Sequence, residues 1–170
     1  WKSFDADGTI WFEDELELDA IINYKEAAES SVKNTLLTIL HHAHLLQPSF
    51  FQETVAYQIE TALTFPKKWG LGTSSTLINN LAQWLKIDAF ELLNNSFGGS
   101  GYDIACAQND TPIFYQLENQ KPNVTPLDFQ PEFLTNLYFV YLNQKQSSKN
   151  AIAAYYKKKH EKLKQSIANI

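Results

Sequence analysis

Residues 66–76 read Pro66-Lys67-Lys68-Trp69-Gly70-Leu71-Gly72-Thr73-Ser74-Ser75-Thr76. This stretch follows a strand pattern and opens a helix pattern, which is the order that a phosphate-binding loop requires. Its glycines let the backbone approach an anion without an intervening Cβ atom. Free amide groups and hydroxyls at a helix start donate hydrogen bonds, and the helix dipole favours negative charge there. The stretch therefore predicts an anion-binding turn between a strand and a helix.

The segments on either side of this loop carry clear periodicity. Residues 53–65 alternate between two faces and predict a half-buried strand. Apolar residues at helical spacing predict a helix that runs through Leu85. Asp88 is placed to cap a short helix that ends at Phe97, and residues 98–101 then interrupt the chain.

The outer parts of the chain predict further elements of both kinds. On the amino-terminal side we expect a hairpin of residues 1–4 and 9–12, a connection over 13–25 and a helix over 26–47. On the carboxyl-terminal side we expect the following elements: a helical turn at 102–107, a strand at 111–117, a proline-containing loop or domain boundary at 119–131, a buried strand at 137–142, a polar turn at 143–149 and a basic helix at 150–168.

Composition excludes several classes of protein. The 170 residues fit one domain or slightly more, and 44% hydrophobic residues suffice for a core. A net charge of −5 argues against a nucleic-acid partner. No apolar run reaches the roughly 20 residues of a membrane span, so we expect no membrane partner. The single cysteine, Cys106, fits a reducing compartment, and we expect a cytoplasmic protein of open oligomeric state.

Four hydroxyl residues in succession, Thr73 to Thr76, distinguish the glycine loop from an ordinary helix start. One cap needs one hydroxyl, so a plain turn capped by Thr73 or Ser74 stays an alternative. Four hydroxyls suit phosphate oxygens together with a hard metal ion. The spacing of Gly70 and Gly72 fits neither a Walker A loop nor a Rossmann turn.

A second glycine-rich loop follows about 30 residues later, and five of the six glycines lie between Gly70 and Gly101. It reads Gly98-Gly99-Ser100-Gly101-Tyr102-Asp103. An ordinary helix end with a flexible turn is one interpretation. The other places Asp103 opposite the first loop, where a carboxylate can accept a hydroxyl proton during phosphoryl transfer.

Together the two loops resemble the motifs of the GHMP kinases, the family of galactokinase, homoserine kinase, mevalonate kinase and phosphomevalonate kinase. Residues 66–75 are similar to the family pattern P-x-x-x-G-L-G-S-S-A, with Thr73 and Ser75 as conservative departures. Residues 99–105 resemble the pattern G-S-G-[hydrophobic]-D-[hydrophobic]-A, in a form closest to the phosphomevalonate and mevalonate kinase branch. Two motifs in this order are far more specific than either alone.

The resemblance implies an ATP-dependent kinase that uses ATP and Mg²⁺ and phosphorylates a mevalonate-like or sugar-like acceptor. It implies an α+β fold, with a ribosomal-S5-domain-2-like domain followed by part of a ferredoxin-like domain. We assign residues 1–118 to the first domain and 119–170 to the start of the second.

The resemblance also implies roles for individual residues. The triphosphate would be wrapped by residues 70–76 and flanked by Lys68, and Ser74 would contact magnesium. Asp103 would lie next to the acceptor hydroxyl and serve as the catalytic residue. The acceptor side would include four further residues, namely Ser100, Gly101, Ser147 and Ser148.

Two departures from the family pattern carry expectations of their own. The family motif with a lysine near the acceptor hydroxyl is absent, and we expect it to precede Trp1 in a longer chain that also continues past Ile170. Leu92 stands where mevalonate kinases carry a magnesium-binding glutamate, and Glu91 is one residue away, turned by about 100° on a helix. Magnesium would then rest on Ser74 and the nucleotide.

Other interpretations compete with the kinase. Phe4 to Ile10 also resembles the D-x-D-G-T motif of haloacid dehalogenase-like phosphatases, in which Asp5 would attack phosphate and Asp7 would act as acid and base. A non-catalytic nucleotide-binding module is a further alternative. His41 and His44 share a helical face, but a metal site there would lack nearby cysteine or acidic ligands.

Overall fold

The computed structural model describes residues 1–26, 31–52, 55–140, 150–151 and 153–156. It divides into two compact units, one formed by Trp1–Lys67 and Leu71–Phe139, the other by Lys68–Gly70 and Val140–Ile170. The first unit is a mixed α+β structure, and this coarse prediction is confirmed. The assignment of residues 119–170 to a second domain stays a prediction.

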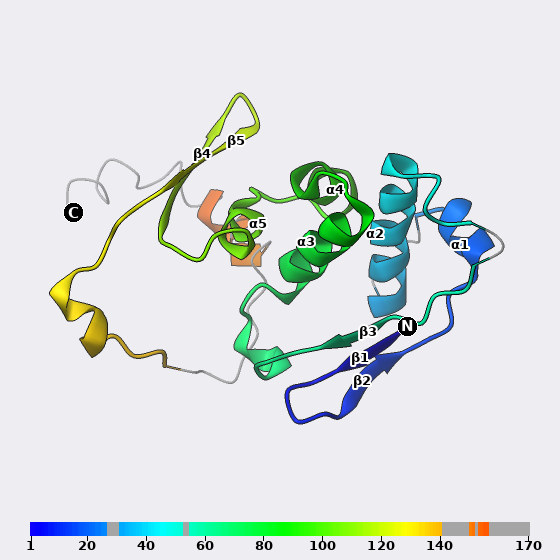
Figure 1. The fold of residues 1–170 in the computed structure, drawn as a ribbon, viewed down its shortest axis with the longest axis horizontal. Helices are drawn as coiled ribbons and strands as arrows, with labels where there is room; N and C mark the ends of the chain where they lie inside the picture. The colour runs from blue at the N-terminus through cyan, green and yellow to red at the C-terminus, as the bar shows by residue number, and fades with distance from the viewer. Residues whose placement is uncertain (27–30, 53–54, 141–149, 152, 157–170) are drawn as a thin grey trace. The chain divides into compact units, whose positions relative to one another are not determined.

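A three-stranded sheet begins the first unit. Strands β1 (Lys2–Phe4) and β2 (Ile10–Glu13) form the predicted antiparallel hairpin, whose turn is closed by the Asp5 amide and the Thr9 carbonyl oxygen at 2.8 Å. Strand β3 (Glu60–Ala62) pairs with β1 in parallel, so the order is β2-β1-β3 (Figure 1).

The predicted strand over 53–65 is mostly wrong. Only Glu60–Ala62 pair, because β1 offers only three residues as a partner, and residues 55–59 are irregular. Residues 53 and 54 lie outside the described part of the chain.

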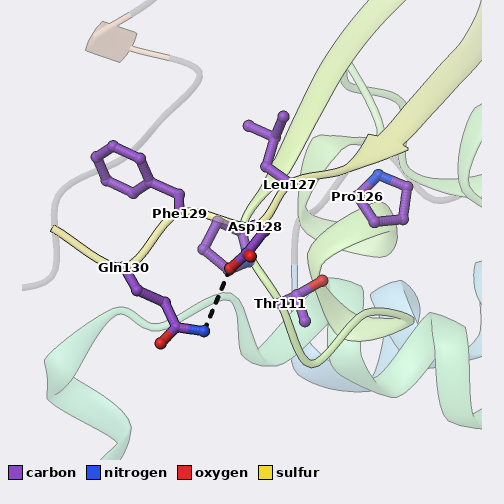
Figure 2. A pocket seen from close by; sticks show the side chains of 7 residues that line it. Thr111, Pro126, Leu127, Asp128, Phe129 and Gln130 are labelled. Carbon is purple, nitrogen blue, oxygen red and sulfur yellow. Dashed lines mark hydrogen bonds between the residues drawn. The ribbon is translucent and has the colours of Figure 1, made fainter.

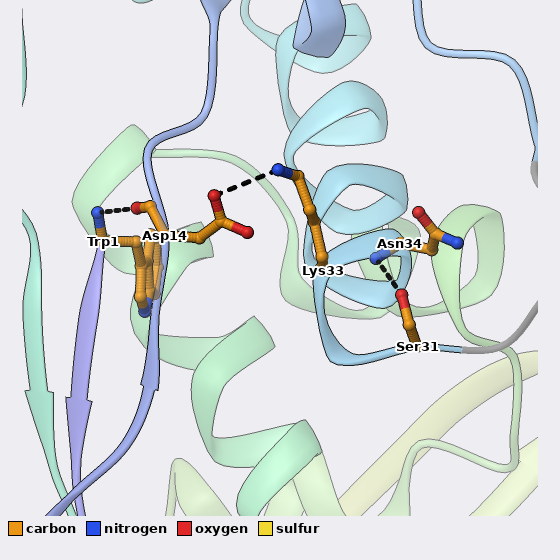
Figure 3. A network of polar contacts seen from close by, with 5 residues as sticks. All are labelled: Trp1, Asp14, Ser31, Lys33 and Asn34. Atoms are coloured by element: carbon orange, nitrogen blue, oxygen red, sulfur yellow. Dashed lines mark hydrogen bonds and ion pairs between the residues drawn. The ribbon is translucent and has the colours of Figure 1, made fainter.

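Polar contacts join the sheet to helix α2 (Val32–Leu46). The Trp1 backbone nitrogen donates to the carbonyl oxygen of Asp14 at 2.8 Å, and the Asp14 carboxylate pairs with Lys33 at 3.0 Å (Figure 3). Ser31 caps that helix, because its hydroxyl accepts the Asn34 amide at 3.1 Å. These contacts set helix α2 beside the end of β2.

Four helices supply most of the core. These are α2 (Val32–Leu46), α3 (Thr73–Leu85), α4 (Ala89–Ser96) and α5 (Tyr102–Ala107), and α1 (Leu18–Ile22) packs on α2. The predicted helix over 26–47 begins only at Val32, and α1 lies inside the predicted connection over 13–25. The helices at 77–85, 89–96 and 102–107 are confirmed. The fully buried side chains come from these helices and include Ile39, Leu40, Ile78, Leu85, Leu92 and Ile104.

A second hairpin follows α5. Strand β4 (Ile113–Glu118) is the predicted one, but β5 (Lys121–Pro126) lies inside the predicted loop over 119–131. The turn residues Asn119 and Gln120 both have positive φ, at 52° and 64°, which is a type I′ turn with an unusual second residue. The prolines of β5 are tolerated because each strand of a two-stranded sheet has an open edge.

The apolar run after β5 is not a buried strand. The 3-10 helix η2 (Glu132–Asn136) leads into an irregular segment in which Tyr138 and Phe139 are 85% and 98% exposed. This corrects the described part of the strand predicted over 137–142. Residues 141–149 lie outside the described residues, as does most of the predicted basic helix; residues 150, 151 and 153–156 are helical.

Candidate functional site

The glycine loop forms the entry to α3. Lys67–Trp69 make a short 3-10 helix, η1, and Gly70 and Gly72 both have positive φ, at 72° and 69°. Gly72 is the N-cap residue of α3, and no side chain caps this end of the helix among the described residues. The left-handed backbone explains why glycine occupies these positions. Because glycine has no side chain, the N-cap residue provides no acceptor for the first-turn amides of α3.

The four hydroxyls of this loop do not share one environment. The Thr76 hydroxyl donates to the Gly72 carbonyl oxygen at 3.1 Å, within its own helix. Ser75 is 9% exposed and belongs to the buried side of α3. Thr73 and Ser74 are partly exposed at the first turn. Of the predicted phosphate ligands, these two keep a side-chain hydroxyl at the helix start that is open to a ligand.

Asp103 lies beside this helix start. Gly101, with φ 81°, is the N-cap of α5, and Asp103 is in the first turn of that helix. A Cβ atom placed on Gly72 would lie 3.9 Å from both Cγ and Oδ1 of Asp103. Gly72 and the Asp103 side chain, which are about 30 residues apart in sequence, therefore lie close together. The carboxylate also raises the pKa of the neighbouring Tyr102 phenol, mainly through its negative charge.

A hydrogen bond between the buried Asn79 and the exposed Gln108 joins the two helices. The Asn79 side chain on α3 accepts a hydrogen bond at 2.9 Å from the Gln108 side chain at the end of α5. Asn79 is 2% exposed, and the fully buried Ile78 and Ile104 lie in the same core. Because a buried amide must be paired, this contact fixes how α3 and α5 are rotated against each other.

Tyr115 is a residue at this site that the sequence interpretation missed. It lies on β4, and its hydroxyl donates to the carbonyl oxygen of Ser100. No local motif surrounds it, and its partner is 15 residues away in sequence, so periodicity alone could not find it. Ser100, which the resemblance places on the acceptor side, is exposed and held by this contact.

The other residues to which the resemblance points lie in η1, in α4 or outside the described residues. Lys68 lies in η1 and is exposed. Ser147 and Ser148 lie outside the described residues. Leu92, at the position of the family's glutamate, is fully buried in the core, and Glu91 is exposed in the first turn of α4.

The two aspartates of the phosphatase-like motif accept hydrogen bonds from the protein around the first hairpin turn. The Asp5 carboxylate accepts the Ala6 amide at 2.8 Å and the Lys67 amide at 3.1 Å. The Asp7 carboxylate accepts both the amide and the hydroxyl of Thr9, at 2.9 and 2.6 Å, and these bonds lower the pKa of Asp7. Both side chains thus have a structural use in the hairpin.

The histidines of α2 contact neighbouring groups of the protein. His41 makes a 2.8 Å hydrogen bond to the carbonyl oxygen of Ile21, and the His44 ring lies 6.1 Å from that of Phe51. Within the described ranges, no group of three or more His, Cys, Asp and Glu side chains could hold a metal ion.

Two open pockets flank the second hairpin. One, of about 320 Å³, lies where β5 leaves the hairpin, and Figure 2 shows its lining of Thr111, Pro112, Pro126, Leu127, Asp128, Phe129 and Gln130. The other, of about 740 Å³, is lined by Phe90, Glu118, Asn119, Lys121, Pro122, Asn123 and Val124. Neither pocket is lined by residues 70–76 or by Asp103.

Comparison of the chain with protein-family models, with curated proteins and with solved structures found no match. Among the described residues, no helix has the length and apolar character of a membrane span. A function can therefore be proposed only from the geometry around Gly72 and Asp103 and from the motifs of the two glycine loops.

Proposed function

We propose that the chain is the nucleotide-binding part of an ATP-dependent small-molecule kinase of the GHMP type. The observation that carries this proposal is the closeness of Gly72 to the Asp103 carboxylate, 3.9 Å from where a Cβ atom would stand. In this proposal the helix start that binds an anion lies next to a carboxylate that can accept a proton. Phosphoryl transfer requires this arrangement, because the nucleotide phosphate and the acceptor hydroxyl must be held side by side.

The start of α3 supplies the features that a phosphate needs. Its first-turn amides have no side-chain cap, and Thr73 and Ser74 add hydroxyl donors at the same turn. The dipole of a 13-residue helix adds partial positive charge there. The glycine at position 72 keeps the approach open, since its Cβ would point toward Asp103. In this proposal residues 70–76 and Lys68 bind the triphosphate.

Two negative groups this close require a cation. A phosphate beside the Asp103 carboxylate would be repelled by several kcal/mol at the effective dielectric of a protein surface, about 4 kcal/mol for unit charges 4 Å apart. Magnesium, with Ser74 as its protein ligand, would offset that repulsion because it prefers hard oxygen donors. We therefore propose that the nucleotide is bound as its magnesium complex.

Asp103 is the proposed catalytic residue. Its carboxylate would accept the proton of the acceptor hydroxyl as the phosphoryl group is transferred. Ser100 and Gly101, together with Ser147 and Ser148, would contact the acceptor, which we propose is mevalonate-like or sugar-like. The GHMP architecture, with an S5-like domain before a ferredoxin-like one, and a cytoplasmic location belong to the same proposal.

The proposal predicts that MgATP raises the melting temperature of the chain. At 100 times the dissociation constant the stabilisation amounts to about 2.7 kcal/mol, which differential scanning fluorimetry detects as a shift of several degrees. ATP without magnesium should give a much smaller shift. In Gly72→Ala the MgATP shift should be lost, because the new methyl group stands in the space next to Asp103.

Gly8→Ala is the matched control for this substitution. Gly8 has a similar φ of 80° and no atom within 4 Å of its added Cβ, so it carries a similar backbone cost without placing a methyl group beside Asp103. Both variants should melt lower than the parent chain, but Gly8→Ala should keep its MgATP shift. An equal MgATP shift in the parent chain and in Gly72→Ala would refute the proposal.

A phosphatase centred on Asp5 remains the second candidate. It is favoured by one observation: Asp5 directly follows β1, which pairs in parallel with β3, as a nucleophile at the carboxyl end of a parallel strand would. Hydrolysis of a generic phosphoester that is lost in Asp5→Asn, without any MgATP shift, would decide for this candidate. Binding of MgATP without turnover would instead indicate the non-catalytic nucleotide module.

A further inference from the structure

The second hairpin makes a direct contact with the loop that carries Asp103. The Tyr115 hydroxyl on β4 donates a hydrogen bond to the Ser100 carbonyl oxygen, immediately before the N-cap residue of α5. Burial raises the pKa of the Tyr115 phenol, so the hydroxyl keeps its proton and remains a donor.

Gly101 is pressed between Tyr115 and α4. A Cβ atom at Gly101 would lie 3.0 Å from the Tyr115 hydroxyl oxygen and 3.0 Å from Cδ1 of Phe90. A Cβ atom in contacts this short would require its neighbours to move by a few tenths of an ångström, and the φ of 81° disfavours a side chain as well. The turn before α5 therefore has its place set from two sides, by the ring of Phe90 and by the hydroxyl of Tyr115.

The start of α5 depends on this turn. The helix has six residues, and its first backbone hydrogen bond runs from the Ala105 amide to the Gly101 carbonyl oxygen at 3.1 Å. So short a helix does not hold its own starting point, because helix nucleation is unfavourable. A shift of Gly101 would move the first turn of α5 and Asp103 with it.

From these contacts we infer that Tyr115 is a positioning residue of the proposed kinase site. Its hydroxyl anchors Ser100 and Gly101, fixes where α5 begins and so holds the Asp103 carboxylate beside Gly72. The catalytic meaning of this role rests on the proposed function, whereas the positioning itself is a property of the ligand-free chain. The second hairpin thereby becomes part of the site without touching the nucleotide.

Tyr115→Phe tests the inference, because it keeps the ring and removes only the donor. Loss of one hydrogen bond of ordinary strength should speed exchange of the Ala105 amide by about fivefold, measured by NMR in the ligand-free chain. The amide resonance of Gly72, which lies on another helix, should shift as Asp103 moves. The Thr76 amide, bonded to the Gly72 carbonyl oxygen at 3.0 Å, is an internal reference whose exchange should not change.

Tyr57→Phe is the matched control, since Tyr57 also donates to a backbone carbonyl oxygen, that of Phe50, at 2.7 Å. It should leave the exchange of Ala105 and the resonance of Gly72 as in the parent chain. If Tyr115→Phe leaves both unchanged, or if Tyr57→Phe changes them equally, Tyr115 is not a positioning residue.

A titration with MgATP separates this inference from the proposed function. Tyr115→Phe should keep the dissociation constant of MgATP within about twofold, which is under 0.5 kcal/mol, because the amides of α3 are untouched. A loss of affinity as large as that of Gly72→Ala would make Tyr115 part of nucleotide binding and overturn the inference. Absence of any MgATP binding in the parent chain would refute the kinase alone, since the exchange experiment needs no ligand.

Discussion

Asn79 is a buried polar residue that links α3 to the end of α5. It is 2% exposed in an otherwise apolar part of α3, and its side-chain oxygen accepts the Gln108 amide at 2.9 Å. A buried polar group that loses its partner costs more than the hydrogen bond contributes, because the remaining group stays desolvated. Because Asn79 needs Gln108 as its partner, α3 and α5 prefer one rotation relative to each other.

We expect Asn79→Ala to lower the free energy of unfolding by about 1 kcal/mol, because it removes the hydrogen bond to Gln108, whose exposed amide can then bond to water. Urea denaturation followed by circular dichroism measures this difference. Asn80→Ala is the matched control, since Asn80 is the next residue of the same helix and is exposed. A loss in Asn79→Ala no larger than in Asn80→Ala would show that the amide pair does not stabilise the chain.

At the level of elements, the caps and turns explain which predictions hold. Asp88 could be identified as the cap of α4 because a cap is local, and its carboxylate accepts the amides of Phe90 and Glu91 at 2.7 and 3.1 Å. Helix α1 was missed because five residues without a side-chain cap give little periodic signal. The extent of β3 was overestimated because alternation reports burial on two faces and says nothing about the length of the partner strand.

Strand β5, in contrast, is an element that the sequence did not predict. Pro122 and Pro126 led to a loop prediction, and Gln120 in a left-handed conformation is a poor signal for a hairpin turn. The glycine loops could be predicted because a backbone with positive φ, as at Gly72 and Gly101, favours glycine in the sequence. The role of Tyr115 could not be predicted, because its contact with Ser100 depends on how β4 packs and not on a nearby sequence pattern.

We expect Asp88→Ala to reduce the free energy of unfolding by about 1 kcal/mol, as is typical for loss of an N-cap. Thermal melting at neutral pH measures the change, and the exposed Asp110 offers Asp110→Ala as a control of equal charge. If the two variants melt at the same temperature, the cap hydrogen bonds of α4 contribute nothing to stability.

At the level of the whole molecule, stability should depend on pH through α2. Burial lowers the pKa of His42, and the charge of His41, whose ring lies 5.4 Å away, lowers it further. A lowered pKa means that the folded chain disfavours protonation of this imidazole. The contribution of His42 to the free energy of unfolding is therefore complete above its ordinary pKa of about 6.5 and declines as pH falls below that value.

We expect the free energy of unfolding to fall between pH 7.5 and 5.5, and to fall less in His42→Gln, whose side chain does not titrate. Urea denaturation at the two pH values measures both differences. An identical pH dependence in the two proteins would exclude His42 as its source.

The middle position of β1 has a consequence for the order in which the chain folds. One neighbour of β1, β2, emerges from the ribosome almost at once, whereas the other, β3, is synthesised some sixty residues later. The nascent hairpin must therefore keep one edge of Lys2–Phe4 unpaired while α1 and α2 are being made. Closure of that edge must wait for Glu60–Ala62, which directly precede the glycine loop in sequence.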